Sequence, residues 1–501
     1  MDSVAEGVLL SLNVNDDLLN ALAEHIRADG VVVLADPSRK RLTCMENESS
    51  EKDKSRYDRM CSVVSKLNLA KVKEGSDLEK KLIEFAPRTK SLAKFPLMVL
   101  LRKVGALDDL VPLQTNRELL HSSVSHVGWL SGSGALREVH LHRIASYAGP
   151  HVSLYFRFMQ NYTTWLIIPA IISVVFELSD FTENVKLSPF LLGWGLGFLW
   201  LSWKPMRAEN EPMNNKEEET QQLFAYHTDT SSFSRFVRSI FTWCLFCVYA
   251  VVCTVILFTS LRVRWHLIDP RGAMIGSVVY SAAQALLSLQ CDFITRRLTS
   301  WEHHAEDAGY EKSRLRKAIA IRVILYFAFP IHLAITAPFD VLRNFVSTTF
   351  TIKQVTQAIT EMAPWMMTKL LPSKRHLSPA EGESWNVNDE YLEMAVQFAS
   401  LLSFGFVFPL SFLFAFLNNV LEGHFDAEKL SISKRTLPIN LDLAALWIDT
   451  FGFLTFFGAG VNLVLIARIG SVDLAKAVMI TILALKIASF FLEKKRVRHQ
   501  L

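Results

Sequence analysis

Residues 389–430 read DEYLEMAVQFASLLSFGFVFPLSFLFAFLNNVLEGHFDAEKL, and their pattern of apolar and acidic residues determines the predicted fold. Its middle is almost wholly apolar, and Phe408-Pro409 divides it into two segments. Because proline ends or kinks a helix, we predict one helix up to about Val407 and a second from Pro409 on, packed back to back. Each segment has about 18 residues or more, enough to cross a bilayer core of about 30 Å when its polar end extends it.

Acidic residues stand at the outer ends of both segments: Glu390 and Glu393 before the apolar run, Glu422 and Asp426 after it. These spacings place each pair on one helix face, and an antiparallel hairpin brings the two pairs to similar depth. Without a cation, four converging carboxylates would repel or become protonated where the dielectric constant is low. Hard oxygen ligands in this number suit Ca²⁺. The alternative is that these acids only face water at the membrane surface.

The whole chain is too apolar for an ordinary soluble protein. Of its 501 residues 50% are hydrophobic and 20% charged, and the mean hydropathy is +0.23. Because the apolar residues are clustered, we predict a polytopic membrane protein. The net charge of +4 is too small to indicate a nucleic-acid partner. Cys244 and Cys247 lie in an apolar run, where small core residues are expected rather than a zinc or redox site.

Hydropathy and charge divide the chain into regions. We predict a cytosolic N-terminal α+β domain (1–127), a linker with a pre-membrane segment (128–152), a transmembrane domain (153–493) and a short basic cytosolic tail (494–501). The N-terminus lacks a basic n-region, so no cleaved signal peptide is expected.

The N-terminal domain is predicted to be small and ferredoxin-like. Residues 7–14 and 30–35 have the pattern of buried strands. A helical period runs between them over Asp16–Ala28, with Asp16 as its cap. A second helix is predicted over 55–72.

The remainder is predicted to be all-α, with about ten transmembrane helices. We expect them over 153–178, 187–203, 238–261, 273–295, 317–337, 341–368, 390–407, 409–430, 444–467 and 473–493. An even number places both termini on one side, and most of the basic segments fall there. By the positive-inside rule that side is cytosolic, and the protein is expected in the plasma membrane or the endoplasmic reticulum.

Polar residues inside membrane spans cost free energy, so they usually face the bundle interior or line a water-filled cavity. Ser277, Ser281, Gln284 and Ser288 form one stripe along the predicted helix 273–295. The stripe indicates either a transport pathway or close packing between helices. No nucleotide loop, Ser/His/Asp set or zinc spacing stands out, so no enzyme activity is predicted.

Further charges reach membrane depth on the next two predicted helices. Arg322 lies on the first, and Lys353, Gln357 and Glu361 share a face of the second at a spacing of four residues. Glu361 lies near the cytosolic end, beside the hairpin, and is a candidate for a fifth carboxylate of the Ca²⁺ site.

Several segments resemble the anoctamin family of calcium-activated chloride channels and phospholipid scramblases. The resemblance covers roughly residues 115 to 495, and its motifs are LYFRFMQNYTTWLIIPA (154–170), LTSWEHH (298–304), YEKSRLRK (310–317), QVTQAITEMAPW (354–365), EYLEM (390–394), FPLSFLFAFLNNVLE (408–422) and FDAEKL (425–430).

The resemblance implies two Ca²⁺ ions per subunit between the sixth, seventh and eighth helices, and a homodimer whose subunits each contain a groove. Acidic ligands of the family correspond to Glu361, Glu390, Glu393, Glu422 and Asp426. Gln357 falls where the family usually has Asn, and its longer amide is a further candidate ligand.

We therefore expect a Ca²⁺-activated membrane transport protein in which the metal site gates a pathway. The favoured function is phospholipid scrambling with associated ion conduction, with the polar stripe as a track for lipid headgroups. A dedicated Ca²⁺-activated chloride channel, with Lys353 and Arg322 as favourable charges, is the first alternative. A membrane tether or trafficking protein with a vestigial pore is the second.

Overall fold

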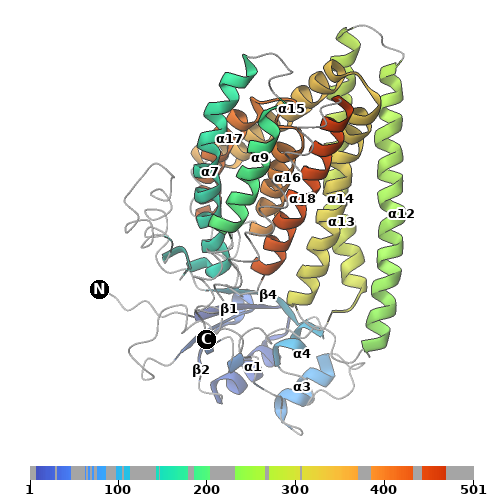
Figure 1. Ribbon diagram of the computed structural model, residues 1–501. Helices are drawn as coiled ribbons and strands as arrows, with labels where there is room; N and C mark the ends of the chain where they lie inside the picture. The colour runs from blue at the N-terminus through green and yellow to red at the C-terminus, as the bar shows by residue number, and fades with distance from the viewer. Residues whose placement is uncertain are drawn as a thin grey trace, which may run out of the picture.

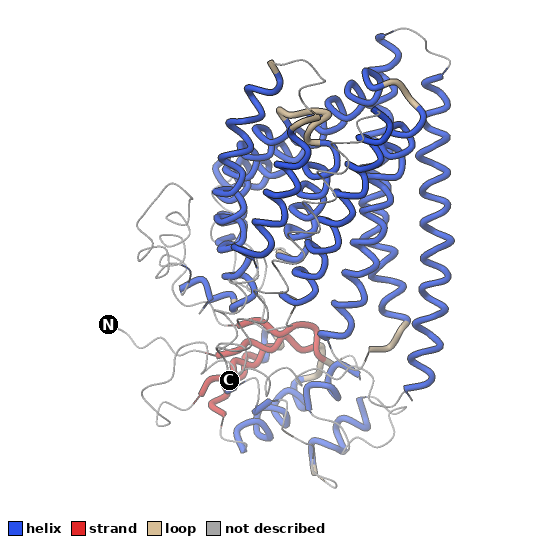
Figure 2. Tube along the Cα trace, in the orientation of Figure 1, coloured by secondary structure: helices blue, strands red, loops and turns tan. Residues whose placement is uncertain are grey.

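A computed structural model shows a bundle of long helices with a small β-sheet at one end (Figures 1 and 2). The residues that it describes are 7–28, 31–46, 62–63, 66–67, 70, 72, 76–85, 97–103, 106–112, 141, 143–145, 147–178, 185–203, 232–265, 270–304, 307–370, 385–432 and 443–469.

The sheet has four antiparallel strands, namely β1 (Gly7–Leu12), β2 (Val31–Asp36), β3 (Arg41–Glu46) and β4 (Leu107–Pro112). They lie in the order β2-β3-β1-β4, so the first strand is central and the last is an edge. Helix α1 (Asp16–Ala28) joins β1 to β2, and α3 (Asp77–Phe85) and α4 (Leu97–Lys103) precede β4. This succession of strands and helices is the one expected of a ferredoxin-like domain.

The predicted strands and the helix between them are confirmed, but the helix cap is not the predicted one. The side-chain Oδ1 of Asn15 accepts a hydrogen bond from the Leu18 amide at 3.0 Å. The residue before the helix therefore caps it, and Asp16 is the first helical residue. Most of the helix predicted over 55–72 lies outside the described residues.

The bundle contains nine long elements among the described residues. They are α7 (Pro150–Glu177), α9 (Leu187–Gly197) with its π-helical continuation η3 (Phe198–Trp203), α12 (Ser232–Trp265), α13 (Pro270–Trp301), α14 (Asp307–Thr336), α15 (Phe339–Leu370), α16 (Val387–Phe404), α17 (Ser411–Ile432) and α18 (Ala444–Ile469). Each coincides with a predicted span, and the tenth, 473–493, lies outside the described residues.

Four of these elements are long and apolar enough to cross a bilayer by length and composition: His151–Glu177, Phe233–Thr259, Gly309–Thr336 and Ala445–Arg468. Several of the others bury polar side chains between helices, such as Gln284, Gln397 and Asn418. The predicted number of ten spans is therefore not confirmed, although the chain has the helices of an integral membrane protein.

The hairpin of α16 and α17 differs from the prediction in its turn. Helix α16 ends at Phe404, residues 405–410 form the turn, and α17 begins at Ser411. A Cβ atom at Gly405 would overlap the Leu401 carbonyl and the Phe412 ring, so only glycine fits this turn.

The two helices of the hairpin also do not pack mainly on each other. Helix α16 lies along α18, and α17 lies along α7 and α15. Gly458 lets α18 approach Leu402 of α16 closely, and the Asn462 amide donates to the Leu402 carbonyl. A shared polar contact and a small residue thus fix α18, rather than α17, against α16.

Helix α12 lies at the edge of the bundle (Figure 1). Cys244 and Cys247 are exposed on it, so their predicted place in a core is wrong. The outward face of this helix is apolar, as contact with lipid requires. Hydropathy alone does not distinguish such a lipid-facing residue from a core residue.

Candidate metal centre and transport pathway

Three carboxylates converge where α16 begins and α17 nears its end. Glu390 lies in the first turn of α16, and Glu422 and Asp426 lie one turn apart on α17. One ligand oxygen from each lies within 4.8 Å of those of the other two. All three are buried, Asp426 completely. We refer to Glu390, Glu422 and Asp426 as the carboxylate cluster.

Neutral donors orient each member of the carboxylate cluster. The Tyr155 hydroxyl of α7 donates to Asp426 Oδ2 at 2.5 Å, and the Trp385 indole N–H donates to Glu390 Oε1 at 2.8 Å. The Asn418 amide, one turn before Glu422, donates to Glu422 Oε2 at 2.9 Å. Such outer partners fix the direction of carboxylates that ligate metals.

Lys429 brings a positive charge to the same place. Its Nζ lies 3.1 Å from Glu390 Oε1 and 3.1 Å from Asp426 Oδ1. With one ammonium against three carboxylates, the group keeps two formal negative charges when all are ionised. No spacing in the sequence marks this lysine as part of the site, although FDAEKL contains it.

Glu393 and Gln357 form a neighbouring contact between α16 and α15. The Gln357 amide nitrogen donates to Glu393 Oε2 at 2.5 Å. Within the described part of the chain, the amide oxygen of Gln357 is buried and accepts no hydrogen bond. Glu361 lies on α15 one turn further along, but its side chain is outside the described residues.

This donor set fits Ca²⁺ on its own chemistry. All of the converging atoms are carboxylate or amide oxygens, which Ca²⁺ prefers. Two oxygens on opposite sides of an ion, each at about 2.3–2.6 Å, are about 5 Å apart, and the spread of the carboxylate cluster lies within that span. The buried Gln357 oxygen without a donor is the kind of atom that a cation satisfies.

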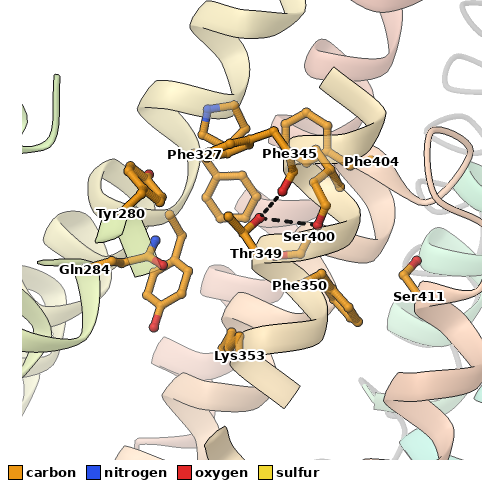
Figure 3. Close-up of a pocket in the computed structure, with 13 residues that line it drawn as sticks. Tyr280, Gln284, Phe327, Phe345, Thr349, Phe350, Lys353, Ser400, Phe404 and Ser411 are labelled. Atoms are coloured by element: carbon orange, nitrogen blue, oxygen red, sulfur yellow. Dashed lines mark hydrogen bonds between the residues drawn. The ribbon is translucent and has the colours of Figure 1, made fainter. Parts of the chain in front are cut away.

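A cavity is lined by residues of the five helices α13, α14, α15, α16 and α17 (Figure 3). Its volume is about 50 Å³, room for a few waters at about 10–15 Å³ each. Aromatic side chains dominate the lining, and the polar ones include Gln284, Thr349, Lys353 and Ser400. The candidate pathway thus contains only a small cavity in this conformation.

Two residues predicted for the pathway line this cavity. Lys353 Nζ lies 4.6 Å from the centre of the Tyr326 ring, a cation–π contact. Gln284 donates from Nε2 to the Leu325 carbonyl of α14 at 2.9 Å, and the Tyr280 hydroxyl donates to the same oxygen at 3.1 Å.

The other predicted pathway residues lie elsewhere among the described residues. Ser277 and Ser288 are buried, and the Ser281 hydroxyl donates to the Ser277 carbonyl at 2.9 Å within α13. Arg322 forms an ion pair with Asp292 of α13 at 3.2 Å. Most of the stripe thus serves helix packing in this conformation, which is the alternative that its small residues allow.

A model of the family described as "Anoctamin: Calcium-activated chloride channel" matches residues 144–494, which is more than half of the chain. The chain belongs to the anoctamin family.

Two anoctamins are similar to it in sequence. Anoctamin-10 of Mus musculus is 23% identical over 409 residues, which cover 70% of this chain and 60% of that protein. Anoctamin-10 of Homo sapiens is 24% identical over 350 residues, which cover 59% of this chain and 53% of that protein. The matches thus span about half to three fifths of the length of these relatives.

In this anoctamin, ion pairs tie the start of α16 to α14. Arg314 is almost completely buried, and it lies 2.7 Å from Glu311 and 3.4 Å from Asp389. Arg296 of α13 approaches Asp389 at 3.8 Å. Asp389 precedes Glu390, so these contacts fix the helix end that presents Glu390 to the carboxylate cluster.

The link between α13 and α14 contains a further buried carboxylate, outside the carboxylate cluster. Glu302 accepts hydrogen bonds from Thr242, from His304 at 2.6 Å, from Ser313 at 2.6 Å and from Lys317 at 2.7 Å. Burial raises the pKa of Glu302, but these donors outweigh it and lower the pKa to about 2. The sequence showed only a helix end here, because an acid next to two histidines also suits a solvent-facing turn.

Proposed function

We propose that this anoctamin is a Ca²⁺-activated transport protein that scrambles phospholipids and conducts ions such as chloride. One observation on α15 carries the proposal. Gln357 contacts Glu393 beside the carboxylate cluster, and Lys353, one helical turn away, lines the cavity. A cation bound at the carboxylates would therefore act on a helix that also closes the pathway.

The residues proposed to hold Ca²⁺ are the carboxylate cluster and Glu393, with Gln357 through its amide oxygen and Glu361 as a fifth acid. Two ions per subunit are proposed from the family resemblance. When bound, Ca²⁺ supplies positive charge that offsets the repulsion among these acids.

The proposed gate is α15. In the structure the Gln357 amide nitrogen donates to Glu393, and aromatic side chains dominate the cavity lining. Drawing the Gln357 and Glu361 end of α15 toward α16 and α17 would move Lys353 and Thr349 with it. A ligand shifts such an equilibrium only by its different affinity for the two states, and ligands on three helices provide that difference.

Lipid scrambling is proposed to require that α13 and α15 separate, since they pack against each other here. Gln284 would then exchange the Leu325 carbonyl for a lipid headgroup. A headgroup that leaves water needs such a partner, because an unpaired polar group in apolar surroundings costs several kcal/mol, about 2–7.

A dedicated chloride channel is the alternative that Lys353 favours. Its ammonium lines the cavity, and a small anion that keeps part of its hydration needs a cationic side chain more than a polar track. The role of a membrane tether with a vestigial pore is less favoured, because buried acids cost stability unless they are used.

Reconstitution in liposomes tests the proposal. Flip of a quenchable fluorescent lipid and chloride efflux would be measured on the same vesicles, with Ca²⁺ and with a chelator. We expect both to rise with Ca²⁺. Chloride flux without lipid flip would support the channel instead, and neither activity in a folded protein that binds Ca²⁺ would support the tether.

A further inference from the structure

We propose that Lys429 is an internal counter-cation of the carboxylate cluster, which Ca²⁺ must displace in order to bind. The inference rests on the proposed Ca²⁺ site and adds a determinant of its affinity. Its observation is the ammonium that bridges two members of the cluster, at 3.1 Å from an oxygen of each.

The position of this ammonium offsets part of the repulsion among the three buried acids. Three carboxylates within 4.8 Å would otherwise repel strongly in a site that excludes water. Lys429 lies on α17, and it pairs both with Asp426 of its own helix and with Glu390 of α16. It therefore holds the two helices together where their charges would drive them apart.

The same position places Lys429 in competition with a bound ion. Lys429 contacts one oxygen of Glu390 and one of Asp426, so an ion that takes ligands from both acids competes with the ammonium for their negative charge. A lysine has three donors and no acceptor, so it cannot become a ligand beside the metal. Because two cations at one site repel each other, the ammonium is expected to move out on its four-carbon stem when Ca²⁺ binds.

The geometry allows this movement. The Lys429 side chain is 17% exposed, whereas the side chain of its partner Asp426 is 0% exposed. The lysine side chain thus reaches the protein surface in part, whereas the acid that it pairs with is enclosed. A fixed Arg fork would be less easily displaced, because it binds a carboxylate through two parallel hydrogen bonds.

The test measures Ca²⁺ binding by isothermal titration calorimetry on the purified full chain in detergent. Lys429→Met keeps most of the stem but removes the charge, and we expect Ca²⁺ to bind at least about tenfold more tightly, since a hydrogen bond to a charged group is lost only from the Ca²⁺-free state. Lys429→Arg should leave the affinity equal to that of the wild type or weaker. Arg316→Gln removes a positive charge from an exposed position on α14 and should leave it unchanged.

Thermal unfolding gives a second readout that does not depend on transport. In chelator, Lys429→Met should unfold at a lower temperature than the wild type, because its acids repel without a counter-cation. Saturating Ca²⁺ should abolish or reverse this difference. A purely structural salt bridge would instead lower the unfolding temperature both with and without Ca²⁺.

The outcomes distinguish failure of the proposed competition from failure of the proposed function. In one outcome, Glu422→Gln weakens Ca²⁺ binding while Lys429→Met binds Ca²⁺ as the wild type does or more weakly. In that case the proposed competition between Lys429 and Ca²⁺ is wrong, and the proposed metal site is supported. If the folded wild type binds no Ca²⁺, the proposed function and the competition both fail.

Discussion

The acids of the candidate metal centre have unequal surroundings, so single substitutions should have unequal effects. Glu422 and Asp426 are buried at the end of α17, whereas Glu393 is only partly buried against Gln357. Charge interactions are screened less in buried positions. The deepest acids should therefore dominate the affinity for Ca²⁺.

Glu422→Gln keeps the size of the side chain and removes one charge. We expect the Ca²⁺ concentration for half-maximal transport to rise by about tenfold or more, and by less for Glu393→Gln. Glu428→Gln, on the same helix but outside the cluster, is the control and should not change it. An unaltered Ca²⁺ response of both Glu422→Gln and Glu393→Gln in a functioning protein would show that the assignment of the site is wrong.

Glu302 predicts a pH dependence of stability. Its pKa is about 2 in the folded protein against an ordinary value of 4.5, so its contribution of about 3 kcal/mol is complete above pH 4.5 and is lost as the pH falls toward 2. Glu302→Gln should unfold at a lower temperature at neutral pH, since Lys317 is left buried without its partner.

The measurement is thermal unfolding of wild type and Glu302→Gln in detergent at several pH values. The difference between them should shrink below pH 4.5, and Glu84→Gln at an exposed position of α3 should behave as the wild type does. A second change, Lys317→Met, should restore part of the stability at neutral pH. A difference that stays constant with pH would refute the role given to Glu302.

Among the elements, the helices could be predicted far better than their neighbours. Long apolar runs and proline positions located nine helices, and the spacing of Glu422 and Asp426 placed both on one face. The sequence did not show which helix faces which. The pairing of α16 with α18 depends on Gly458 and Asn462, and their complementarity with Leu402 arises only in three dimensions.

The candidate site shows the same limit. Acids at the ends of the hairpin were recognisable because carboxylates are rare in apolar surroundings. Lys429, Tyr155 and Trp385 were not, since a lysine after a membrane helix is common and an aromatic residue usually signals a core. The contact of Tyr155 with Asp426 depends on α7 lying beside α17, and that of Lys429 with Glu390 depends on how the start of α16 lies beside α17.

Gln284 of α13 and Lys353 of α15 line the same cavity, and substitutions at these two positions should distinguish lipid transport from ion transport. We expect Gln284→Leu with Ser281→Leu to slow lipid flip by about tenfold or more, because headgroups lose a hydrogen-bonding partner, and to leave Ca²⁺ binding intact. Lys353→Ala should chiefly change ion selectivity. Both would be measured with a quenchable lipid dye and a chloride electrode on the same liposomes.

Gln290→Leu is the matched control for this pair. Gln290 lies on the same helix but is exposed away from the cavity lining, so its loss should not affect flip. Normal flip in the double variant, together with loss of chloride flux in Lys353→Ala, would favour the dedicated channel.

At the scale of the whole molecule, large apolar side chains are exposed and many polar ones are buried. Ile171, Val248, Leu289 and Phe293 are each more than 60% exposed on the outside of the bundle. Gln284, Glu422 and Asn462 are buried inside it. This arrangement is stable when hydrocarbon rather than water covers the helices.

We predict that this anoctamin is a homodimer with cytosolic termini. The family resemblance implies the dimer, and the apolar segment 473–493, which lies outside the described residues, is the proposed partner surface. Native mass measurement in mild detergent should give a species of two chains. A monomer that retains transport in liposomes would contradict the prediction.

The ion pairs between α13 and α14 have a consequence for biosynthesis. Arg322 is paired with Asp292, and Lys317 with Glu302, across the turn that joins the two helices. A charged residue at the centre of a lone helix costs about 2.5–3.5 kcal/mol during insertion by the translocon. The ribosome delivers α13 first, so Asp292 and Glu302 are already present when Arg322 and Lys317 emerge.

We expect the two helices to enter the membrane as one unit. In a glycosylation-reporter assay, α14 should insert less efficiently alone than behind α13, and Asp292→Ala should remove part of that advantage.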